Sequence, residues 1–314
     1  MKIYSENPDI INDESIGLII SNHRCRLDWL YVGWFYAVIC NLGSYLKVVM
    51  KDSLRSVPIF GWSAQLMLSI FLSRKKEADI PYIKRVFSYI LHADKKAVFL
   101  LFPEGTDLSS CNLERSITFS KEKGLREYSQ VLYPKPAGFI TCLRLLKNQS
   151  LSLHDLTVAY KDYTNKKRPT EKAFMYGIFP KEVHIHVKKY KIDDLSDDRA
   201  LLENWLHALF LQKEEMLLNF DRTGSLSSNQ NVNIVEYNHN YLQSTKLMLL
   251  LMVILLISCI SFSWLRWLFV ILIILSVGSR AFNGIDSIEL ALHGSMFISE
   301  MKRRNSSSGN LKLD

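Results

Sequence analysis

Short apolar runs, separated by segments of mixed polarity, mark the first 220 residues of the chain. Residues 15–21 and 97–102 are almost entirely apolar, and runs of this length predict buried strands. Residues 155–163 and 183–190 predict two later strands. The intervals between these runs are long enough for helices, so the pattern indicates an α/β fold around a central sheet.

Three other segments predict helices. Residues 76–96 place apolar side chains at helical spacing among lysines, and residues 198–220 form a second amphipathic pattern that would close the domain. Residues 29–46 carry no charge and resemble a membrane span in length. A polar motif directly before this segment, and asparagine, glycine and serine near its end, favour a buried or interfacial helix instead.

The clearest hydrophobic segment lies near the other end of the chain. Residues 247–277 contain one charge, Arg266, and the uncharged part 247–265 would form a helix of about 28 Å, close to the thickness of a bilayer core. The sequence WLRW at 264–267 is typical of an interfacial anchor. Residues 267–279 are short for a second span and either dip back as a hairpin or continue as an interfacial helix. We expect the protein to be membrane-bound.

This pattern divides the chain into four parts. Residues 1–220 form the globular domain, and the polar residues 221–245 form a flexible linker. Residues 246–280 are the transmembrane or hairpin segment. Residues 281–314 form an amphipathic stretch followed by a disordered basic tail.

Composition narrows the classes of partner. The formal net charge is +8 and is spread along the chain, which suits an anionic membrane surface or a phosphorylated substrate better than nucleic acid. The five cysteines form no CxxC pair, so we expect neither a disulfide framework nor a zinc knuckle. His184 and His186 share one face of a predicted strand without a third ligand nearby, and we expect no metal there.

Candidate chemistry begins with the stretch SNHRCRLDWL, where His23 follows a predicted strand and Asp28 comes five residues later. A neutral imidazole can accept a proton from an alcohol, and a carboxylate on its other nitrogen fixes the tautomer. Asp28 can reach that nitrogen if a turn separates the strand from the next helix. Alone, this spacing is weak evidence, because a chain with eight histidines can contain it by chance.

A second candidate follows the strand predicted at 97–102. Glu104, Gly105 and Thr106 come after a proline, in a sequence that favours a turn with free backbone amides. Such a turn can hold an anion or a polar glycerol group.

Three further positions complete the candidate site. Lys51 and Arg74 would clamp a phosphate, the arginine bidentately and the lysine as a point charge. Pro134 lies in the sequence YPKPAGF, which predicts a rigid loop that shapes the wall of a channel.

The motifs NHRCRLD, VPIFGW…FLSR, FPEGTD and YPKPAGF occur in this order, and together they resemble the four blocks of the PlsC-type glycerolipid acyltransferases. The resemblance covers roughly residues 15–292 and is strongest to the lysocardiolipin acyltransferases and their relatives that act on lysophosphatidic acid or lysophosphatidylinositol. Enzymes of this family usually carry a membrane segment ahead of the first block. Here 21 residues precede Asn22, so we expect an isoform or fragment without that anchor. The fourth block more often reads PRTTGF.

The resemblance implies a fold, a reaction and a location. The fold would be a mixed central sheet flanked by helices. His23, oriented by Asp28, would deprotonate the free hydroxyl of a lysophospholipid, which attacks the thioester of acyl-CoA; no cofactor and no metal are required. Lys51, Arg74 and the turn at Glu104–Thr106 would hold the phosphate-glycerol end. Membrane lipids would be further partners, in the endoplasmic reticulum or alternatively a mitochondrial membrane, with the domain facing the cytosol.

Two alternatives remain open at the level of sequence. The chain could be a catalytically idle family member that binds membranes or lipids. Cys25, two residues after His23, could in principle be a thiol nucleophile. Acyl transfer by a general base needs no such nucleophile, and we favour the His23–Asp28 pair.

Overall fold

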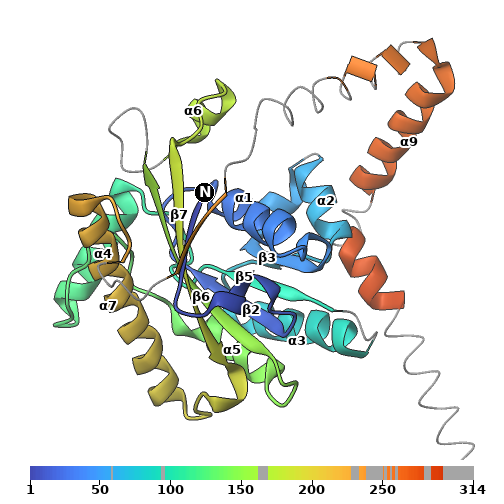
Figure 1. The fold of residues 1–314 in the computed structure, drawn as a ribbon. Coiled ribbons are helices and arrows are strands. Elements are labelled where there is room, and N and C mark those ends of the chain that lie inside the picture. The colour runs from blue at the N-terminus through green and yellow to red at the C-terminus, as the bar shows by residue number, and fades with distance from the viewer. Residues whose placement is uncertain are drawn as a thin grey trace, which may run out of the picture.

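An eight-stranded mixed sheet forms the centre of the protein (Figure 1). This computed structural model describes residues 1–57, 59–92, 96–161, 169–227, 233–237, 261–278 and 284–292, and helical residues at 250, 253–254 and 257–258. The strands are β1 (Lys2–Ser5), β2 (Ile16–Ser21), β3 (Leu46–Lys51), β4 (Ile70–Leu72), β5 (Val98–Leu101), β6 (Ser152–Lys161), β7 (Glu182–Lys191) and β8 (Asn233–Glu236).

The strand order is β4-β3-β5-β2-β6-β7-β1-β8. The five strands from β4 to β6 are parallel, β7 is antiparallel to β6, β1 is parallel to β7, and β8 is antiparallel to β1. The mixed sheet expected from the resemblance is thus confirmed. Because β2, β3, β4 and β5 run in the same direction, their carboxyl ends meet at one edge, where α/β proteins bind ligands.

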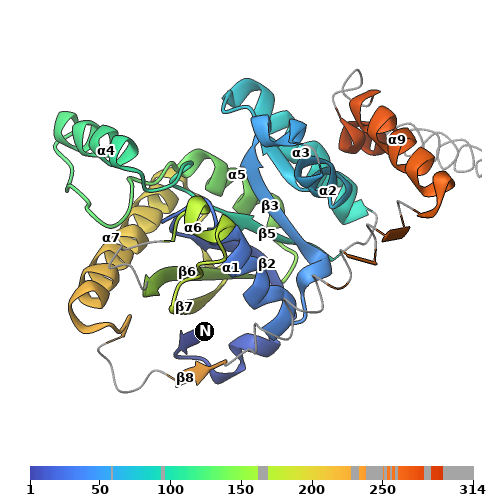
Figure 2. The same cartoon turned by 90° about the horizontal axis from the view of Figure 1, so that it is seen from above.

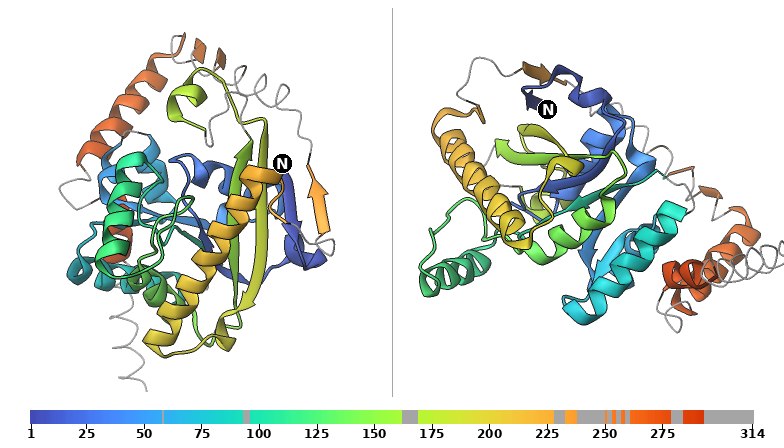
Figure 3. Two further views of the ribbon diagram at one scale, coloured as in Figure 1. Left: turned by 90° about the vertical axis from the view of Figure 1, so that its left-hand side faces the viewer. Right: turned by 90° about the horizontal axis from the view of Figure 1, so that it is seen from below.

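Helices cover both faces of this sheet (Figures 2 and 3). The helices are α1 (Asp28–Trp34), α2 (Phe60–Leu66), α3 (Lys76–His92), α4 (Ser110–Glu122), α5 (Pro136–Leu146), α6 (Glu171–Met175), α7 (Arg199–Thr223) and α9 (Ser263–Gly278), of which α9 stands apart from the sheet (Figure 2). One core cluster joins the sheet to α3, α5 and α7, and a second joins it to α1 and the turn that follows α1.

The central strand β2 shows why the predicted strands lack polar positions. Leu18 and Ile20 point into the cluster with α3, α5 and α7, whereas Ile19 between them points into the cluster with α1. A strand that is buried on both faces has no solvent side, so its sequence is continuously apolar. The strands predicted around β2, β5, β6 and β7 are confirmed.

The uncharged segment 29–46 is not one helix. α1 ends at Trp34 and continues as a π-helical turn, Phe35–Ile39, in which the amide of Cys40 donates to the carbonyl of Phe35 (3.1 Å). The chain then enters β3 at Leu46. The predicted single helix was wrong: residues 29–39 are helical, whereas residues 40–46 form the connection to β3 and its first residue.

Further elements lie beyond residue 220. α7 ends at Thr223, capped by Gly224 at φ 74°, and β8 falls within the predicted linker. α9 contains the WLRW sequence, and Phe262 just before it is not helical. Within the part of the chain that is described, no helix is both long and apolar enough to cross a membrane.

Part of the predicted membrane segment 246–280, including residues 246–249 and 279–280, lies outside the described residues, and so do residues 281–283 and 293–314 of the predicted tail. The single crossing and the hairpin both stay predictions at this stage.

Candidate active site

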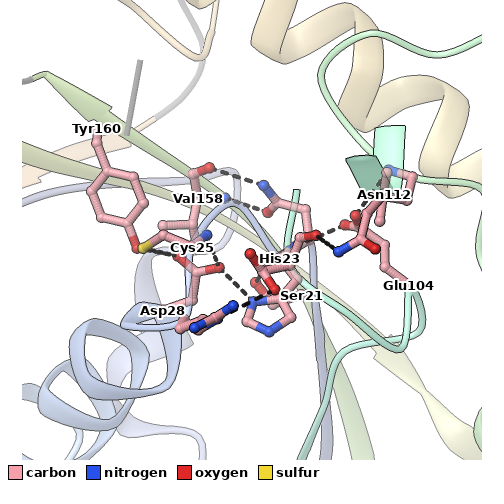
Figure 4. Close-up of polar contacts among 12 residues, drawn as sticks. Ser21, His23, Cys25, Asp28, Glu104, Asn112, Val158 and Tyr160 are labelled. Carbon is pink, nitrogen blue, oxygen red and sulfur yellow. Dashed lines mark hydrogen bonds and ion pairs between the residues drawn. The ribbon is translucent and has the colours of Figure 1, made fainter. Parts of the chain in front are cut away.

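The first block lies at the carboxyl end of β2, which Asn22 fixes to the neighbouring strand β6. Its side-chain amide donates to the carbonyl of Val158 (3.0 Å) and its side-chain oxygen accepts from the Val158 amide (2.7 Å). Asn22 is fully buried. It replaces the backbone pairing that ends here, so the next residue, His23, leaves the sheet from a rigid point (Figure 4).

His23 and Asp28 are in direct contact. Nδ1 of His23 lies 2.8 Å from Oδ2 of Asp28, the fully buried first residue of α1. Asp28 also accepts from the Cys25 amide (3.0 Å), the Cys25 thiol (3.2 Å) and the Tyr160 hydroxyl (2.6 Å). The carboxylate is therefore held by four donors, as Figure 4 shows, and presents a fixed acceptor to the imidazole.

The environment of His23 favours a base. Burial lowers its pKa, but the hydrogen bond to Asp28 and the negative charges of Asp28, Glu104 and Asp107 outweigh this and raise the pKa above its ordinary value. Because Nδ1 donates to Asp28, the neutral ring carries its lone pair on Nε2. The ring stacks on Phe102 with centroids 4.3 Å apart and is 16% exposed, so it is fixed yet accessible.

Glu104 lies beneath this pair, 1% exposed. One carboxylate oxygen accepts from the His23 amide (2.7 Å) and the other from the Leu132 amide (2.8 Å). Burial raises the pKa of Glu104 to about 8, although both amides act in the opposite direction. The side chain thus joins the first block to the segment that leads into the fourth, and its oxygens contact the backbone of the protein.

The turn after β5 brings the second and third blocks together. Gly105 has φ 74°, a conformation that favours glycine, and its carbonyl accepts from Nη2 of Arg74 (2.6 Å). Oγ1 of Thr106 accepts from the side-chain amide of Asn112 (3.1 Å). The exposed Lys135 is also close, because a Cβ on Gly105 would lie 3.6 Å from its Cδ.

Lys51 and Pro134 complete the predicted set. Lys51 is the exposed last residue of β3 and lies opposite Leu72 of β4, two residues before Arg74. Pro134 is buried, and the amide of the next residue, Lys135, donates to the carbonyl of Pro103 (2.8 Å). All four blocks therefore meet at the edge formed by the carboxyl ends of the parallel strands.

Several residues of this site carried no role in the sequence analysis. Tyr160 and Asn22 orient the pair, Asn112 holds the turn, and Lys135 adds a positive charge beside it. Tyr160 is 132 positions from Asp28, so local spacing gives no sign of the contact. A tyrosine near the carboxyl end of a predicted strand was the only available signal.

Two alternative sites are disfavoured by the geometry. Cys25 is buried with its thiol directed at Asp28, and burial raises its pKa strongly, so a nucleophilic thiolate is not favoured there. The ring of His184 lies between the Tyr4 hydroxyl (2.8 Å) and Glu182 (3.0 Å), so protein groups already occupy both of its nitrogens.

Comparison with known proteins agrees with this arrangement. Residues 2–160 match the family model described as Acyltransferase, and residues 173–255 match the model described as Acyltransferase C-terminus. The fold and this family match define a group-transfer enzyme. The chain belongs to the acyltransferase family.

The relatives have more specific names. The chain is 33% identical over 287 residues to lysocardiolipin acyltransferase 1 of Gallus gallus (88% of this chain, 75% of the relative) and 34% identical over 286 residues to that of Mus musculus (the same shares). It is 33% identical over 216 residues to lysophosphatidylinositol acyltransferase 10 of Caenorhabditis elegans (68% of this chain, 54% of the relative).

Proposed function

We propose that this protein transfers a fatty acyl chain from acyl-CoA to the free hydroxyl of a lysophospholipid. The contact of 2.8 Å between His23 and the buried Asp28 carries this proposal, because it supplies a base for an alcohol. The relatives named for lysocardiolipin and lysophosphatidylinositol support the class of acceptor. Lysophosphatidic acid is a third candidate acceptor.

The reaction follows from the tautomer of His23. Nε2 takes the proton of the lipid hydroxyl while Asp28 stabilises the imidazolium that forms. The oxygen then bonds to the thioester carbonyl carbon, the carbon–sulfur bond breaks, and the imidazolium returns its proton to the coenzyme A thiolate. The products are the diacyl phospholipid and free coenzyme A. The proton transfers in these steps use the side chains of His23 and Asp28.

The acceptor's phosphate would bind at the basic edge of the site. Arg74 and Lys135 both lie beside the Gly105 turn, and Lys51 lies at the end of the adjacent strand. All three side chains belong to exposed residues, so a headgroup can reach them. Glu104 would act through the backbone of His23 and not by touching lipid.

We further propose that residues 246–280 attach the protein to a membrane, with the endoplasmic reticulum as the expected location. The apolar sequence of this segment and the exposed apolar side chains of α9, such as Trp264 and Trp267, support attachment. A lipid substrate that resides in a bilayer is reached most directly by an enzyme held at the surface of that bilayer.

Replacement of the base tests the reaction. His23→Ala should lower kcat/KM for labelled oleoyl-CoA and a lysophospholipid by about 100- to 10,000-fold, the usual contribution of a general base. His186→Ala, on β7, is the matched control and should retain activity, with circular dichroism reporting the fold of both variants. Near-full transfer by His23→Ala would refute the mechanism.

A panel of acceptors tests the substrate class. Lysophosphatidic acid, lysophosphatidylinositol, lysophosphatidylglycerol and lysocardiolipin, each offered with several acyl-CoAs, should give unequal rates, because the exposed basic groups distinguish headgroups. Equal use of all four would argue against the proposed acceptor. Lipid binding without any transfer would instead support the idle, lipid-binding alternative.

A further inference from the structure

Residues 284–292, which follow the apolar segment, dock on the globular domain through a buried ion pair. Asp286 is 1% exposed and lies between Nη1 of Arg55, with which it forms an ion pair, and the hydroxyl of Tyr82, which donates to it (2.7 Å). The Arg55 guanidinium in turn lies over the ring of Phe71, 4.6 Å from the centroid. A buried carboxylate is tolerated only where such partners are in place.

Neighbouring contacts make this docking specific. The amide of Ile285 donates to Oε1 of Gln65 (2.8 Å), the hydroxyl of Tyr89 donates to Glu289 (2.5 Å), and Leu290, 3% exposed, belongs to the core cluster with α3. Gly284 has φ 108°, and a Cβ there would lie 2.5 Å from Oε1 of Gln65. We call residues 284–292 and these contacts the C-terminal clamp.

The chain is also fixed to the domain before the apolar segment begins. β8 pairs antiparallel with β1, with Val235 opposite Ile3. The amide of Tyr237 donates to the carbonyl of Met1 (2.8 Å), and its side chain packs against the cluster that contains α1. The segment from 238 to 283 therefore starts and ends on the same folded domain.

From these two attachments we infer that the apolar segment enters and leaves the membrane on the side of the catalytic domain. A single crossing would place the clamp beyond a hydrocarbon layer of about 30 Å, where Asp286 could not reach Arg55 or Tyr82. The non-helical Phe262, between helical Ser261 and α9, is a point at which the segment can reverse. The inference rests on the proposed membrane attachment and does not depend on acyl transfer.

Thiol labelling in sealed vesicles tests this topology. The native Cys111 on α4 is exposed and reports the side of the catalytic domain. Leu292→Cys, in a chain that also carries Cys111→Ser, Cys40→Ser and Cys259→Ser, reports the end of the clamp, since Leu292 is 60% exposed. A membrane-impermeant maleimide should label both sites to the same fraction before detergent, a ratio of about one.

The outcomes separate this inference from the proposed reaction. Labelling of position 292 only after detergent, with Cys111 labelled before it, would overturn the inference while leaving acyl transfer intact. Complete release of the protein by alkaline carbonate would overturn it as well. Loss of transfer with equal labelling would refute the proposed function alone.

Charge reversal tests the clamp itself. Arg55→Glu and Asp286→Arg should each speed amide hydrogen exchange at residues 285–292 at least tenfold, because each leaves a like-charged or unpaired buried group. The double variant should restore much of the protection, since it remakes the pair with opposite polarity. Glu236→Gln on the exposed edge strand is the control. Unchanged exchange in both single variants would show that the clamp does not hold the segment.

Discussion

Asp28 gathers hydrogen bonds from parts of the chain that are distant in sequence. The Cys25 amide and thiol and the His23 ring belong to the loop before α1, whereas Tyr160 lies near the carboxyl end of β6. Each hydrogen bond restricts the rotation of the Asp28 carboxylate. The orientation of His23 is thus determined by β6 as well as by its own loop.

The Tyr160 hydroxyl can be removed with little change of shape. Tyr160→Phe should lower kcat by about tenfold, equivalent to about 1.4 kcal/mol, because Asp28 loses its shortest hydrogen bond. Steady-state kinetics should show the loss in kcat with KM nearly unchanged. Tyr176→Phe, at an exposed position, is the control. Full activity in Tyr160→Phe would show that the loop alone orients Asp28.

The raised pKa of His23 predicts the pH dependence. The base works when neutral, so kcat/KM should be low at acid pH and rise with pH through one ionisation above 6.5. Asp28→Asn removes the largest of the interactions that raise the pKa of His23 and leaves the burial that lowers it. The midpoint should therefore move to lower pH in this variant, together with a smaller maximal rate. A midpoint that stays in place would mean that another group controls the profile.

For single residues, the sequence could predict contacts between side chains that are close in the chain, but few others. His23 and Asp28 are five residues apart, and a strand end followed by a helix brings them together with few alternatives. The roles of Glu104 could not be predicted, because a carboxylate after a proline is equally compatible with a ligand contact and with the backbone contacts it makes.

Among the elements, α7 and β6 are joined by a buried ion pair. Nζ of Lys213 lies 2.5 Å from Asp155 and donates to the carbonyl of Leu156. Burial lowers the pKa of Lys213 despite the attraction of Asp155. The ion pair therefore fixes the position of α7 against β6 more than it adds to the free energy of unfolding. It sets the register of α7 against the strand that carries Tyr160.

Removal of one partner should be costly. Lys213→Met should lower the free energy of unfolding by about 3 to 5 kcal/mol, because Asp155 is left buried and uncompensated. Arg126→Met breaks the exposed pair with Glu215 on the same helix and should cost less than about 1 kcal/mol. Urea unfolding followed by fluorescence measures both values. Similarly small losses of unfolding free energy in the two variants would contradict the burial of the pair between Lys213 and Asp155.

The elements differ in how far their sequences reveal them. β2 and β5 are buried on both faces and bounded by polar residues, so their apolar runs predict them. β4 lies within the uncharged stretch 57–72, where periodicity cannot separate a strand from a helix, and β3 begins at the last residue of the uncharged segment 29–46. β1 and β8 have four residues each and are defined by their pairing, which is not local.

On the scale of the whole molecule, charge and apolar surface should act together at a membrane. With a net charge of +8, binding to vesicles should strengthen as anionic lipid is added and weaken as salt is raised. Sedimentation of the protein with vesicles of graded composition measures this dependence. Binding that does not change with anionic lipid or with salt would show that apolar insertion alone holds the protein on the vesicle.

The order of the strands in the sheet could not be predicted from the sequence, because it depends on contacts between residues far apart in the chain. The order of the blocks along the chain predicts their association, but the strand order is set by pairings such as β1 with β7, across about 180 residues. The contact of Asp286 with Arg55 spans 231 positions. No local pattern encodes such distances.

The four donors around Asp28 have one more consequence. The proposed base, His23, is positioned by β2, β6 and the start of α1 together, so a chain in which these elements are misplaced should be inactive. The specific activity of a preparation is then proportional to its fraction of natively folded molecules. Turnover per mole would therefore measure how much of a preparation is correctly folded.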